Sequence, residues 1–381
     1  MEIFELGTIL QMTKGKTPAT QSAEPKAGYM PYVDIEAFET GVIKLYTTGE
    51  KCVPCKDGDI LIVCDGSRSG LVGKAISGYV GSTLAKISAR GIDNQYLYYF
   101  LQGKYAIFNT KKKGTGTPHL KPELLKAQKI YVPDYPEQQR IVSQIEEQLS
   151  QLDNSVETLN KVKQQLAVYR QAVLKEVFCS LHDKRPIKEL SSLVTSGSRG
   201  WAKYYADHGA RFVRITDLTR NSILLQKNTI QYVLIPKNAE GIRSRLNPND
   251  VLISITADLG SIALVPKDIL EAYINQHIAM VRFLNPMQGK FMAWYLKSEY
   301  GQKDLLKNKR GGGKLGLGLD DIRNTPVPFV DDDTANSIVS KIDERISVCE
   351  SIEATVNTAL EKSEAMRQSI LKQAFDAILK E

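Results

Sequence analysis

Residues 136–178 carry an apolar repeat that predicts one long helix. Ile145, Leu152, Leu159, Leu166 and Val173 recur at seven-residue intervals, with further apolar residues between them, which is the a/d pattern of a coiled coil. At a rise of ~1.5 Å per residue, this helix would be roughly 60 Å long. Its outer face is too polar for it to lie inside one globular core, so it needs a partner helix.

The same chain offers that partner. A shift of 197 residues places Ile141–Glu147 on Ile338–Glu344 and Arg170–Lys175 on Arg367–Lys372, with no gap between them. The connecting length permits a parallel or an antiparallel pair. We favour the antiparallel one, because each intervening segment then leaves one end of the rod and the chain gains an internal pseudo-two-fold axis.

The segments before each long helix follow one plan, in which short strand-like runs alternate with Gly, Pro and Asn. Gly58–Ile62 matches Asn249–Ile253. The predicted class is α+β, with two mixed α/β domains joined by two long helices in an antiparallel coiled coil. The expected boundaries are 1–135, 136–182, 183–329 and 330–381. The predicted strands are Tyr32–Ile35, Asp59–Val63, Thr83–Ile87, Lys129–Val132, Arg211–Ile215, Asp250–Ser254 and Ile278–Val281, and the predicted short helices are Asn94–Leu101 and Phe291–Tyr300.

The loops of the two domains differ although the framework is shared. Thr13–Pro18 stands where Ser196–Trp201 stands, and Asp65–Gly70 where Thr256–Ser261 stands. Arg170 and Arg367, equivalent positions of the two helices, are expected to pair with a helix or a domain. Divergent loops on one scaffold are how a fold changes its specificity.

A basic, glycine-rich segment precedes the last strand of each domain, at residues 111–119 and 307–314. Lysine, arginine and glycine suit contact with phosphate, although one such segment alone would be read as a solvated loop. Its recurrence at the same place in both halves favours phosphate contact. The net charge of +7 fits a polyanionic partner but also fits many proteins without one.

Motifs for catalysis or for cofactor binding do not appear. Asn247–Asp250 lacks the second proline and the aromatic residue of a base-holding methyltransferase loop, and Gly311–Leu315 fails the Walker A spacing. The histidines are dispersed, and Cys52 and Cys55 would need two further ligands to hold zinc, so reduced thiols are expected. The chain shows neither an 18-residue apolar run nor a signal peptide, and we expect a cytoplasmic protein with no cofactor, no metal and no membrane contact.

Across nearly its whole length the chain resembles the specificity subunit of Type I restriction-modification systems. Val132–Ile141, with its Pro-x-x-x-Glu-Gln phrase, carries the resemblance together with Tyr169–Lys175 and the opening from Leu6 to Pro18. The second half departs from the pattern, because Val330–Asn336 replaces the Pro-x-x-x-Glu-Gln phrase.

The resemblance implies a non-catalytic subunit of a DNA adenine methyltransferase and endonuclease complex. Each globular part would be a target recognition domain that reads one half of a bipartite sequence in double-stranded DNA. The helices would fix the spacer and bind the methyltransferase subunits, two of them expected, and restriction or translocase subunits would join through the assembled complex. The alternative is a non-catalytic coiled-coil scaffold that binds proteins; a methyltransferase or nuclease ranks third.

The residue types able to read bases or contact phosphate are Arg, Lys, Asn, Gln, Ser and Thr, and an aromatic side chain can stack or wedge. In the first domain the candidates are Lys14, Lys16, Thr17, Ser67, Arg68, Ser69, Lys111, Lys112, Lys113, Thr115, Thr117 and His119. In the second domain they are Ser196, Ser198, Arg199, Trp201, Thr256, Asp258, Gln276, Lys309, Arg310 and Lys314. Each of them taken singly is also an ordinary surface residue, and Trp201 could equally lie at the edge of a core.

Overall fold

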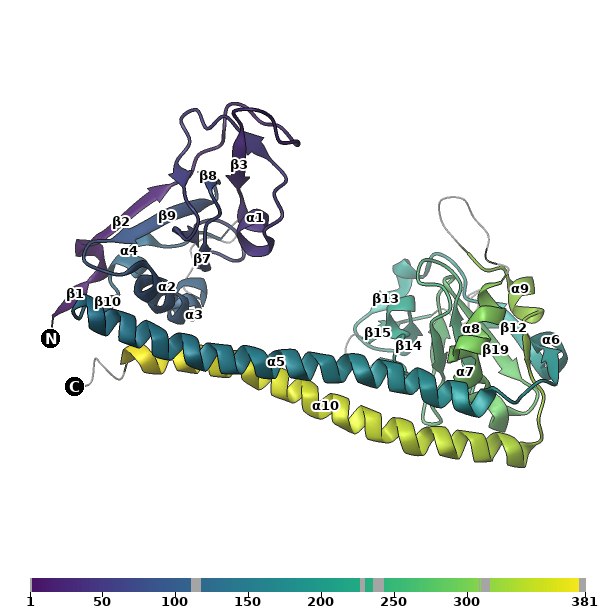
Figure 1. Cartoon of the computed structure of the whole chain (residues 1–381). Helices are drawn as coiled ribbons and strands as arrows, with labels where there is room; N and C mark the ends of the chain where they lie inside the picture. The colour runs from purple at the N-terminus through teal and green to yellow at the C-terminus, as the bar shows by residue number, and fades with distance from the viewer. Residues whose placement is uncertain are drawn as a thin grey trace. The chain divides into compact units, whose positions relative to one another are not determined.

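The computed structural model describes residues 2–110, 118–226, 230–235, 243–307, 309 and 316–376. The chain forms two compact units: unit 1 contains Met1–Leu159 and Thr358–Glu381, and unit 2 contains Asn160–Asn357 (Figure 1). Helix α5 (Tyr135–Phe178) begins in unit 1 and ends in unit 2, whereas α10 (Asp332–Asp376) begins in unit 2 and ends in unit 1. The two long helices predicted from the apolar repeat are therefore confirmed. None of the helices that the structure describes combines the length and hydropathy needed to cross a membrane.

Unit 1 is built on two small four-stranded sheets. The first has the order β2 (Leu10–Lys14), β9 (Leu84–Ala89), β6 (Ile60–Val63), β7 (Val72–Lys74), and the second has the order β4 (Tyr46–Thr47), β3 (Met30–Val33), β8 (Gly78–Val80), β5 (Pro54–Cys55). All four residues of β6 are buried, as expected for a central strand. The other elements are β1 (Ile3–Glu5), which pairs with β10 (Lys129–Tyr131), and the short helices η1 (Leu6–Thr8), α1 (Ile35–Thr40), α2 (Asn94–Gly103), α3 (Tyr105–Thr110) and α4 (Pro122–Lys126).

Unit 2 repeats this plan. Its first sheet has the order β12 (Ser191–Ser196), β19 (Ile278–Phe283), β16 (Val251–Ser254), β17 (Ile262–Leu264), and its second has the order β13 (Tyr205–Ala206), β15 (Gln231–Val233), β14 (Ala210–Val213), β18 (Ala272–Ile274). β11 (Lys184–Pro186) pairs with β20 (Pro326–Pro328). The helices are α6 (Ile187–Leu190), η2 (Trp201–Tyr204), η3 (Ile215–Asp217), η5 (Pro286–Gln288), α7 (Gly289–Lys297), α8 (Glu299–Leu306) and α9 (Leu319–Arg323).

Two sequence predictions of short elements are corrected by capping side chains. The predicted strand Tyr32–Ile35 stops at Val33, because the carboxylate of Asp34 accepts a 2.8 Å hydrogen bond from Ala37 N and begins α1. The predicted helix Phe291–Tyr300 is two helices. Buried Ser298 separates them, donating to Tyr295 O at 2.6 Å and accepting from Gly301 N at 3.2 Å.

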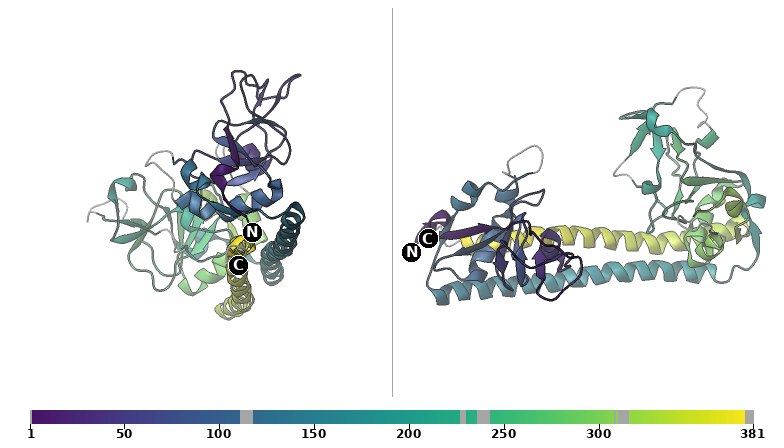
Figure 2. Two further views of the ribbon diagram at one scale, coloured as in Figure 1. Left: turned by 90° about the vertical axis from the view of Figure 1, so that its left-hand side faces the viewer. Right: turned by 90° about the horizontal axis from the view of Figure 1, so that it is seen from above.

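Within each unit, salt bridges between side chains join α5 to α10. In unit 2, Arg170 binds Glu353 at 2.7 Å and Arg345 binds Glu176 at 2.6 Å. As the residue number rises along α5, that of the partner falls along α10, so the helices run in opposite directions there. In unit 1 the pair is Arg367 with Asp153, and the yellow end of α10 lies beside the first part of α5 (Figure 2). Arg170 and Arg367, expected to pair with a helix or a domain, both pair with the other long helix.

The shift of 197 residues between α5 and α10, with a shift of 195 between α2 and α7, also relates contacts in the two units. Phe178 of α5 packs edge-on against Phe291 and Tyr295 of α7, at centroid distances of 5.7 and 5.4 Å. Phe375 of α10 packs in the same way against Tyr96 and Phe100 of α2, at 5.1 and 5.4 Å. The polar contacts match as well, because Gln95 binds Glu146 at 2.9 Å where Lys290 binds Asp343 at 2.5 Å.

Gln138, the last residue of the Pro-x-x-x-Glu-Gln phrase, has a structural role. Its side chain is 1% exposed; its oxygen accepts from Asp93 N at 2.7 Å, and its nitrogen donates to Gly91 O at 3.1 Å and Pro133 O at 2.9 Å. The amide thus fastens the turn before α2 to the start of α5. At the equivalent place in unit 2, where the phrase is absent, Asn285 and Gln288 donate to Asp332 instead.

Candidate nucleic-acid interface

Three distant segments of unit 1 meet where β2 and β6 end. Lys14 Nζ lies 2.8 Å from Asp65 Oδ2, and His119 Nδ1 lies 2.7 Å from Asp65 Oδ1. Backbone contacts hold the same arrangement, since Asp65 and His119 form an isolated β-bridge and Gly66 N donates to Pro118 O at 2.8 Å. The structure therefore brings together Lys14 and His119, two residues predicted to contact DNA, and joins them through Asp65.

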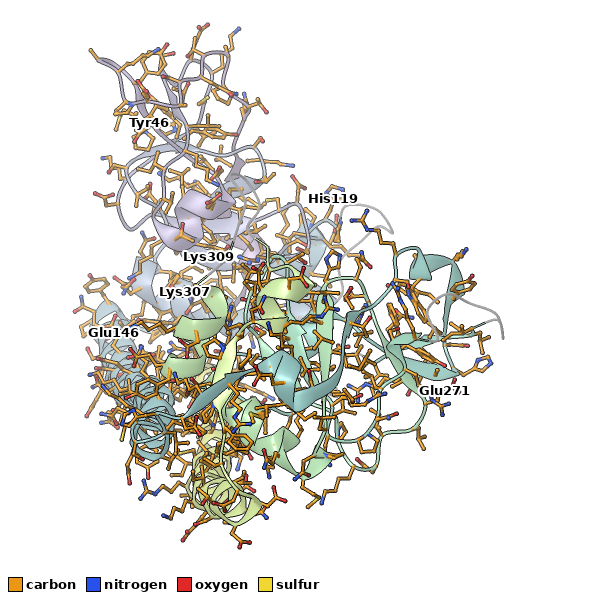
Figure 3. The ribbon with its side chains drawn as sticks, turned by 90° about the vertical axis from the view of Figure 1, so that its right-hand side faces the viewer. Tyr46, His119, Glu146, Glu271, Lys307 and Lys309 are labelled. Carbon is orange, nitrogen blue, oxygen red and sulfur yellow. The ribbon has the colours of Figure 1, made fainter. Side chains whose placement is uncertain are left out.

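Charge complementarity fixes the protonation of the Lys14 and Asp65 pair. Burial alone would raise the pKa of Asp65, but the hydrogen bonds and charges of Lys14 and His119 lower it below its ordinary value. The hydrogen bond to Asp65 raises the pKa of Lys14. Side chains of Lys14 and His119 stay 54% and 55% exposed, and Figure 3 labels His119 at the edge of its unit. Such a group presents both donors and an acceptor to base edges or phosphates.

The corresponding place in unit 2 carries different chemistry. Thr256 forms an isolated bridge with Gly316, as Asp65 does with His119. Thr256 Oγ1 lies 2.7 Å from His277 Nδ1, and Gln276 Nε2 lies 2.9 Å from His277 Nε2. A hydroxyl, an imidazole and an amide thus stand on the framework that holds an ammonium and a carboxylate in unit 1. The two units therefore present different hydrogen-bonding groups at equivalent places.

The strand registers correct the sequence alignment of the first loops by one residue. Lys14 pairs with Ala85, the second residue of β9, and Ser196 pairs with Ala279, the second residue of β19. Ser196 therefore corresponds to Lys14 and not to Thr13. Gly15 and Gly197 then coincide, and both must be glycine, because a Cβ at either position would collide with a carbonyl oxygen of the adjacent segment.

Two of the candidate contact residues are buried, which corrects the expectation for Ser69 and selects the core alternative for Trp201. Trp201 is 5% exposed, stacks on Phe212 with ring centroids 4.8 Å apart and lies 5.5 Å from the ring of Tyr273. It belongs to an aromatic cluster and cannot wedge into a groove as it stands. Ser69 is 0% exposed, and its hydroxyl donates to Gly66 O at 2.9 Å, so it shapes the loop after β6.

The other candidates lie at or near the surface, or outside the described residues. Arg68 pairs with Glu39, and Asp258 lies 2.5 Å from Arg220. Ser198 is half-buried, and its hydroxyl has no hydrogen-bond partner among the described residues. The exposed ones are Lys16, Thr17, Ser67, Arg68, Arg199, Asp258 and Lys309, the last labelled with Lys307 in Figure 3. Those outside the described residues are Lys111, Lys112, Lys113, Thr115, Thr117, Arg310 and Lys314.

Sequence reasoning missed Arg220 and His277 as members of this surface. Arg220 holds Asp258 and donates to Leu259 O at 2.5 Å, which fixes the loop after β16. His277 is not indicated by the sequence, because the histidines are dispersed along the chain. Only its position next to the candidate Gln276 could have indicated that it belongs to the site.

The thiols show no sign of a metal site within the described ranges. No group of three or more His, Cys, Asp or Glu there could hold an ion. Cys55 is buried, and its Sγ donates to Ile76 O at 3.4 Å. Burial also raises the pKa of Cys55 to about 11, which keeps the group a thiol near neutral pH.

Two mixed α/β units, each followed by a long helix, define a class of proteins. Comparison of this chain with known proteins identifies that class. The model of the family described as Type I restriction modification DNA specificity domain matches residues 1–168 and 202–362. The first match covers one globular part and most of the helix that follows it, and the second covers the other globular part from residue 202 and most of its helix. The chain belongs to this family.

Curated relatives agree with this assignment. The Type I restriction enzyme MjaVIII specificity subunit of Methanocaldococcus jannaschii is 26% identical over 331 residues, which cover 80% of this chain and 76% of the relative. The EcoBI specificity subunit of Escherichia coli is 23% identical over 350 residues, covering 83% and 73%.

Solved structures show the same fold. A chain from a study of complex assembly and conformational transition of the type I R-M system is 18% identical, has a TM-score of 0.71 and covers 98% of this chain and 97% of its own length. The HsdS subunit from Thermoanaerobacter tengcongensis is 17% identical, with a TM-score of 0.50 and coverage of 98% and 96%.

Proposed function

We propose that this specificity subunit reads a bipartite DNA target, one half-site with each globular domain. The observation that carries the proposal is the contrast between Lys14–Asp65–His119 in unit 1 and Thr256–Gln276–His277 in unit 2. A shared framework holds both groups at the ends of equivalent strands. The ammonium and carboxylate groups of unit 1 and the hydroxyl and amide groups of unit 2 select different base edges. The two half-sites should therefore be unlike.

The long helices would form one antiparallel coiled coil, and an internal pseudo-two-fold axis would relate the two halves of the chain. Support comes from the ion pairs inside each unit and from the matched packing of Phe178 and Phe375. In this proposal residues 1–135 and 183–329 are the target recognition domains. Residues 136–182 and 330–381 set the spacer and bind methyltransferase subunits, two of them.

The complex that we propose is a DNA adenine methyltransferase and endonuclease, to which this chain contributes recognition and no catalysis. Restriction or translocase subunits would join through the assembled complex. Such a complex acts on DNA in the cytoplasm. The alternative of a protein-binding scaffold has no support among the relatives, whose names are those of specificity subunits.

A gel-shift experiment tests the proposal. The chain, assembled with its methyltransferase subunit, should bind duplex DNA with an affinity that falls steeply as salt rises. Replacing Lys111, Lys112 and Lys113 together with alanine should weaken binding to all sequences. The salt slope should fall by about 0.9 for each phosphate that the variant no longer neutralises.

Arginine at the same three positions is the matched control, because it keeps the charge and should keep the slope. Equal slopes for the alanine and arginine proteins would place this segment off the DNA. A complex without measurable DNA binding at low salt would favour the scaffold.

A further inference from the structure

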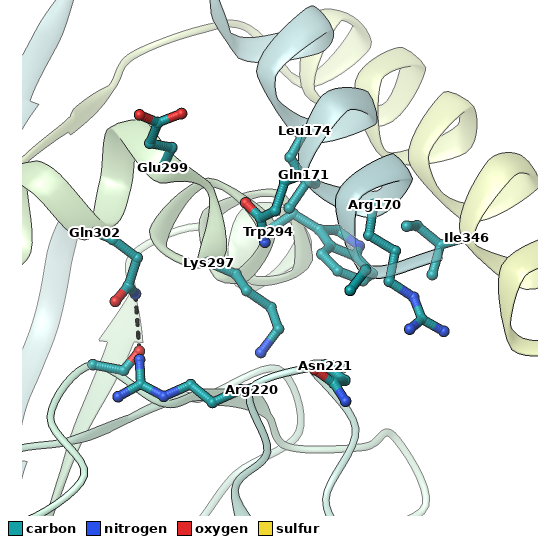
Figure 4. A pocket seen from close by; sticks show the side chains of 12 residues that line it. Arg170, Gln171, Leu174, Arg220, Asn221, Trp294, Lys297, Glu299, Gln302 and Ile346 are labelled. Atoms are coloured by element: carbon teal, nitrogen blue, oxygen red, sulfur yellow. Dashed lines mark hydrogen bonds between the residues drawn. The ribbon is translucent and has the colours of Figure 1, made fainter. Parts of the chain in front are cut away.

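Unit 2 contains a cavity to which the proposed reading of DNA assigns no role. It has a volume of about 460 Å³ and is lined by residues of α5, α7, α8 and α10 and by the loops at Arg220 and Gly260 (Figure 4). This volume lies within the range of small-molecule sites. Three cations line it, Arg170, Arg220 and Lys297, together with the indole of Trp294.

Lys297 is the central group of this cavity. Only 7% of the residue is exposed, and Nζ donates one hydrogen bond, to Thr219 O at 2.8 Å. Among the described residues no carboxylate forms an ion pair with it. An ammonium group has three donors, so the remaining protons can serve a bound acceptor.

The positive potential at Lys297 is not cancelled by its neighbours. Burial, followed by the charges of Arg220 and Arg170, lowers the pKa of Lys297 to about 7, and Asp258 opposes this only in part. The arginines have carboxylate partners, Glu353 for Arg170 and Asp258 for Arg220. Glu299 also lines the cavity, but its carboxylate points away from Lys297 in Figure 4.

Trp294 supplies a second buried donor without a partner. The residue is 4% exposed, and its Nε1 makes no hydrogen bond within the described residues. The contacts of Phe375 and Phe178 place Tyr99 of α2 where Trp294 stands in α7. Tyr99 satisfies its hydroxyl on Glu146 at 3.2 Å. The equivalent of Lys297 is Gln102, which binds Tyr98 at 2.6 Å, so at these two positions the described part of unit 1 has no such pair of free donors.

We propose that the cavity binds an oxyanion of the phosphate type, either free or as the phosphoryl group of a small molecule. Lys297 Nζ would donate to it, the nearby guanidinium groups would add charge, and Trp294 would give the cavity one further donor. Buried cationic donors are the groups that hold phosphate oxygens most strongly. The site lies beside the loop after β16, because Arg220, which lines it, also pairs with the DNA-contact candidate Asp258.

Tryptophan fluorescence provides the test, because the full chain has two tryptophans and Trp201 lies in another cluster. In the full-length Trp201→Phe protein, Trp294 is the only tryptophan. Inorganic phosphate, titrated at constant ionic strength with chloride, should change its emission along a saturating curve. A nucleoside triphosphate titrated in parallel separates the two sources: tighter binding than phosphate indicates a phosphorylated small molecule, and equal or weaker binding indicates the free anion.

Lys297→Met in the same background should weaken binding by about 30-fold or more, the loss expected when one partner of a buried charged hydrogen bond is removed. Lys303→Met, an exposed change on α8, is the control of equal charge and should bind as the parent does. Circular dichroism establishes that both variants are folded. A linear response to phosphate, or equal affinity of the Lys297→Met and Lys303→Met proteins, would overturn the proposal.

Discussion

Phe375, in the last turns of α10, packs edge-on against Tyr96 of α2, with ring centroids 5.1 Å apart and planes at 74°. The side chains are 4% and 0% exposed. Since these residues are 279 positions apart in the sequence, the core of the N-terminal unit is completed by the C-terminal end of the chain. Phe178 plays the same part for α7 of unit 2.

Phe375→Ala should therefore destabilise unit 1, although the substitution lies near the C-terminus. Loss of a buried phenylalanine side chain typically costs about 3 kcal/mol or more. Urea unfolding followed by circular dichroism measures the change. Met366→Ala, a change at a 54% exposed side chain of the same helix, is the control and should shift the midpoint little. Equal midpoints for both variants would show that this aromatic contact does not stabilise the unit.

The apolar repeat is a strong guide to the fold because coiled-coil periodicity is local in sequence. It predicts α5 from Pro136 to Phe178, and the helix begins one residue earlier, at Tyr135. The ends of short elements are harder to predict, because single capping side chains set them. Asp34 ends a strand and begins α1 through one side-chain hydrogen bond, an effect that a strand-like run of apolar residues hides.

The candidate site is less predictable, because its geometry depends on contacts between distant segments. Lys14 and His119 can be chosen by residue type, but nothing in the sequence indicates that both bind Asp65. For Trp201 the sequence leaves a groove contact and the edge of a core equally open. The structure supports the core, because Phe212 and Tyr273, from other strands, cover its ring.

Stability should depend on pH through Lys297. Its pKa is lowered to about 7 in the folded protein, so below that pH the fold must hold a buried ammonium. Between about 7 and the ordinary value of 10.5 the unfolded chain binds the extra proton, and stability rises with pH.

Lys297→Met should consequently stabilise the protein most below about pH 7, by at most about 5 kcal/mol at 1.4 kcal/mol per pKa unit. The gain over the parent should shrink as the pH rises toward 10.5. Heat unfolding of both proteins in chloride buffers at several pH values measures this difference. A difference that stays constant with pH would show that Lys297 is not a buried titrating group.

Matched insertions test the proposed role of the helices. Seven residues added after Leu159 and seven after Val356 preserve the a/d pattern and lengthen each helix by ~10 Å, or about three base pairs. The half-sites should keep their sequences while the spacer grows, and an insertion in one helix alone should leave added seam residues unpaired. Selection from DNA of randomised spacer length provides the measurement. Recovery of the parental spacer by a folded, binding protein with both insertions would assign the spacing to another element.

The most direct test of one domain for one half-site is an exchange of residues 1–130 with those of a relative. The graft should keep Tyr96 and Phe100, so that Phe375 still has its partners. With the methyltransferase subunit present, sequencing of methylated bases in genomic DNA reports the target of each protein. We predict that one half-site becomes that of the relative, while the other half-site and the spacer stay as in the parent. A simultaneous change of both half-sites, or of neither, would contradict the account.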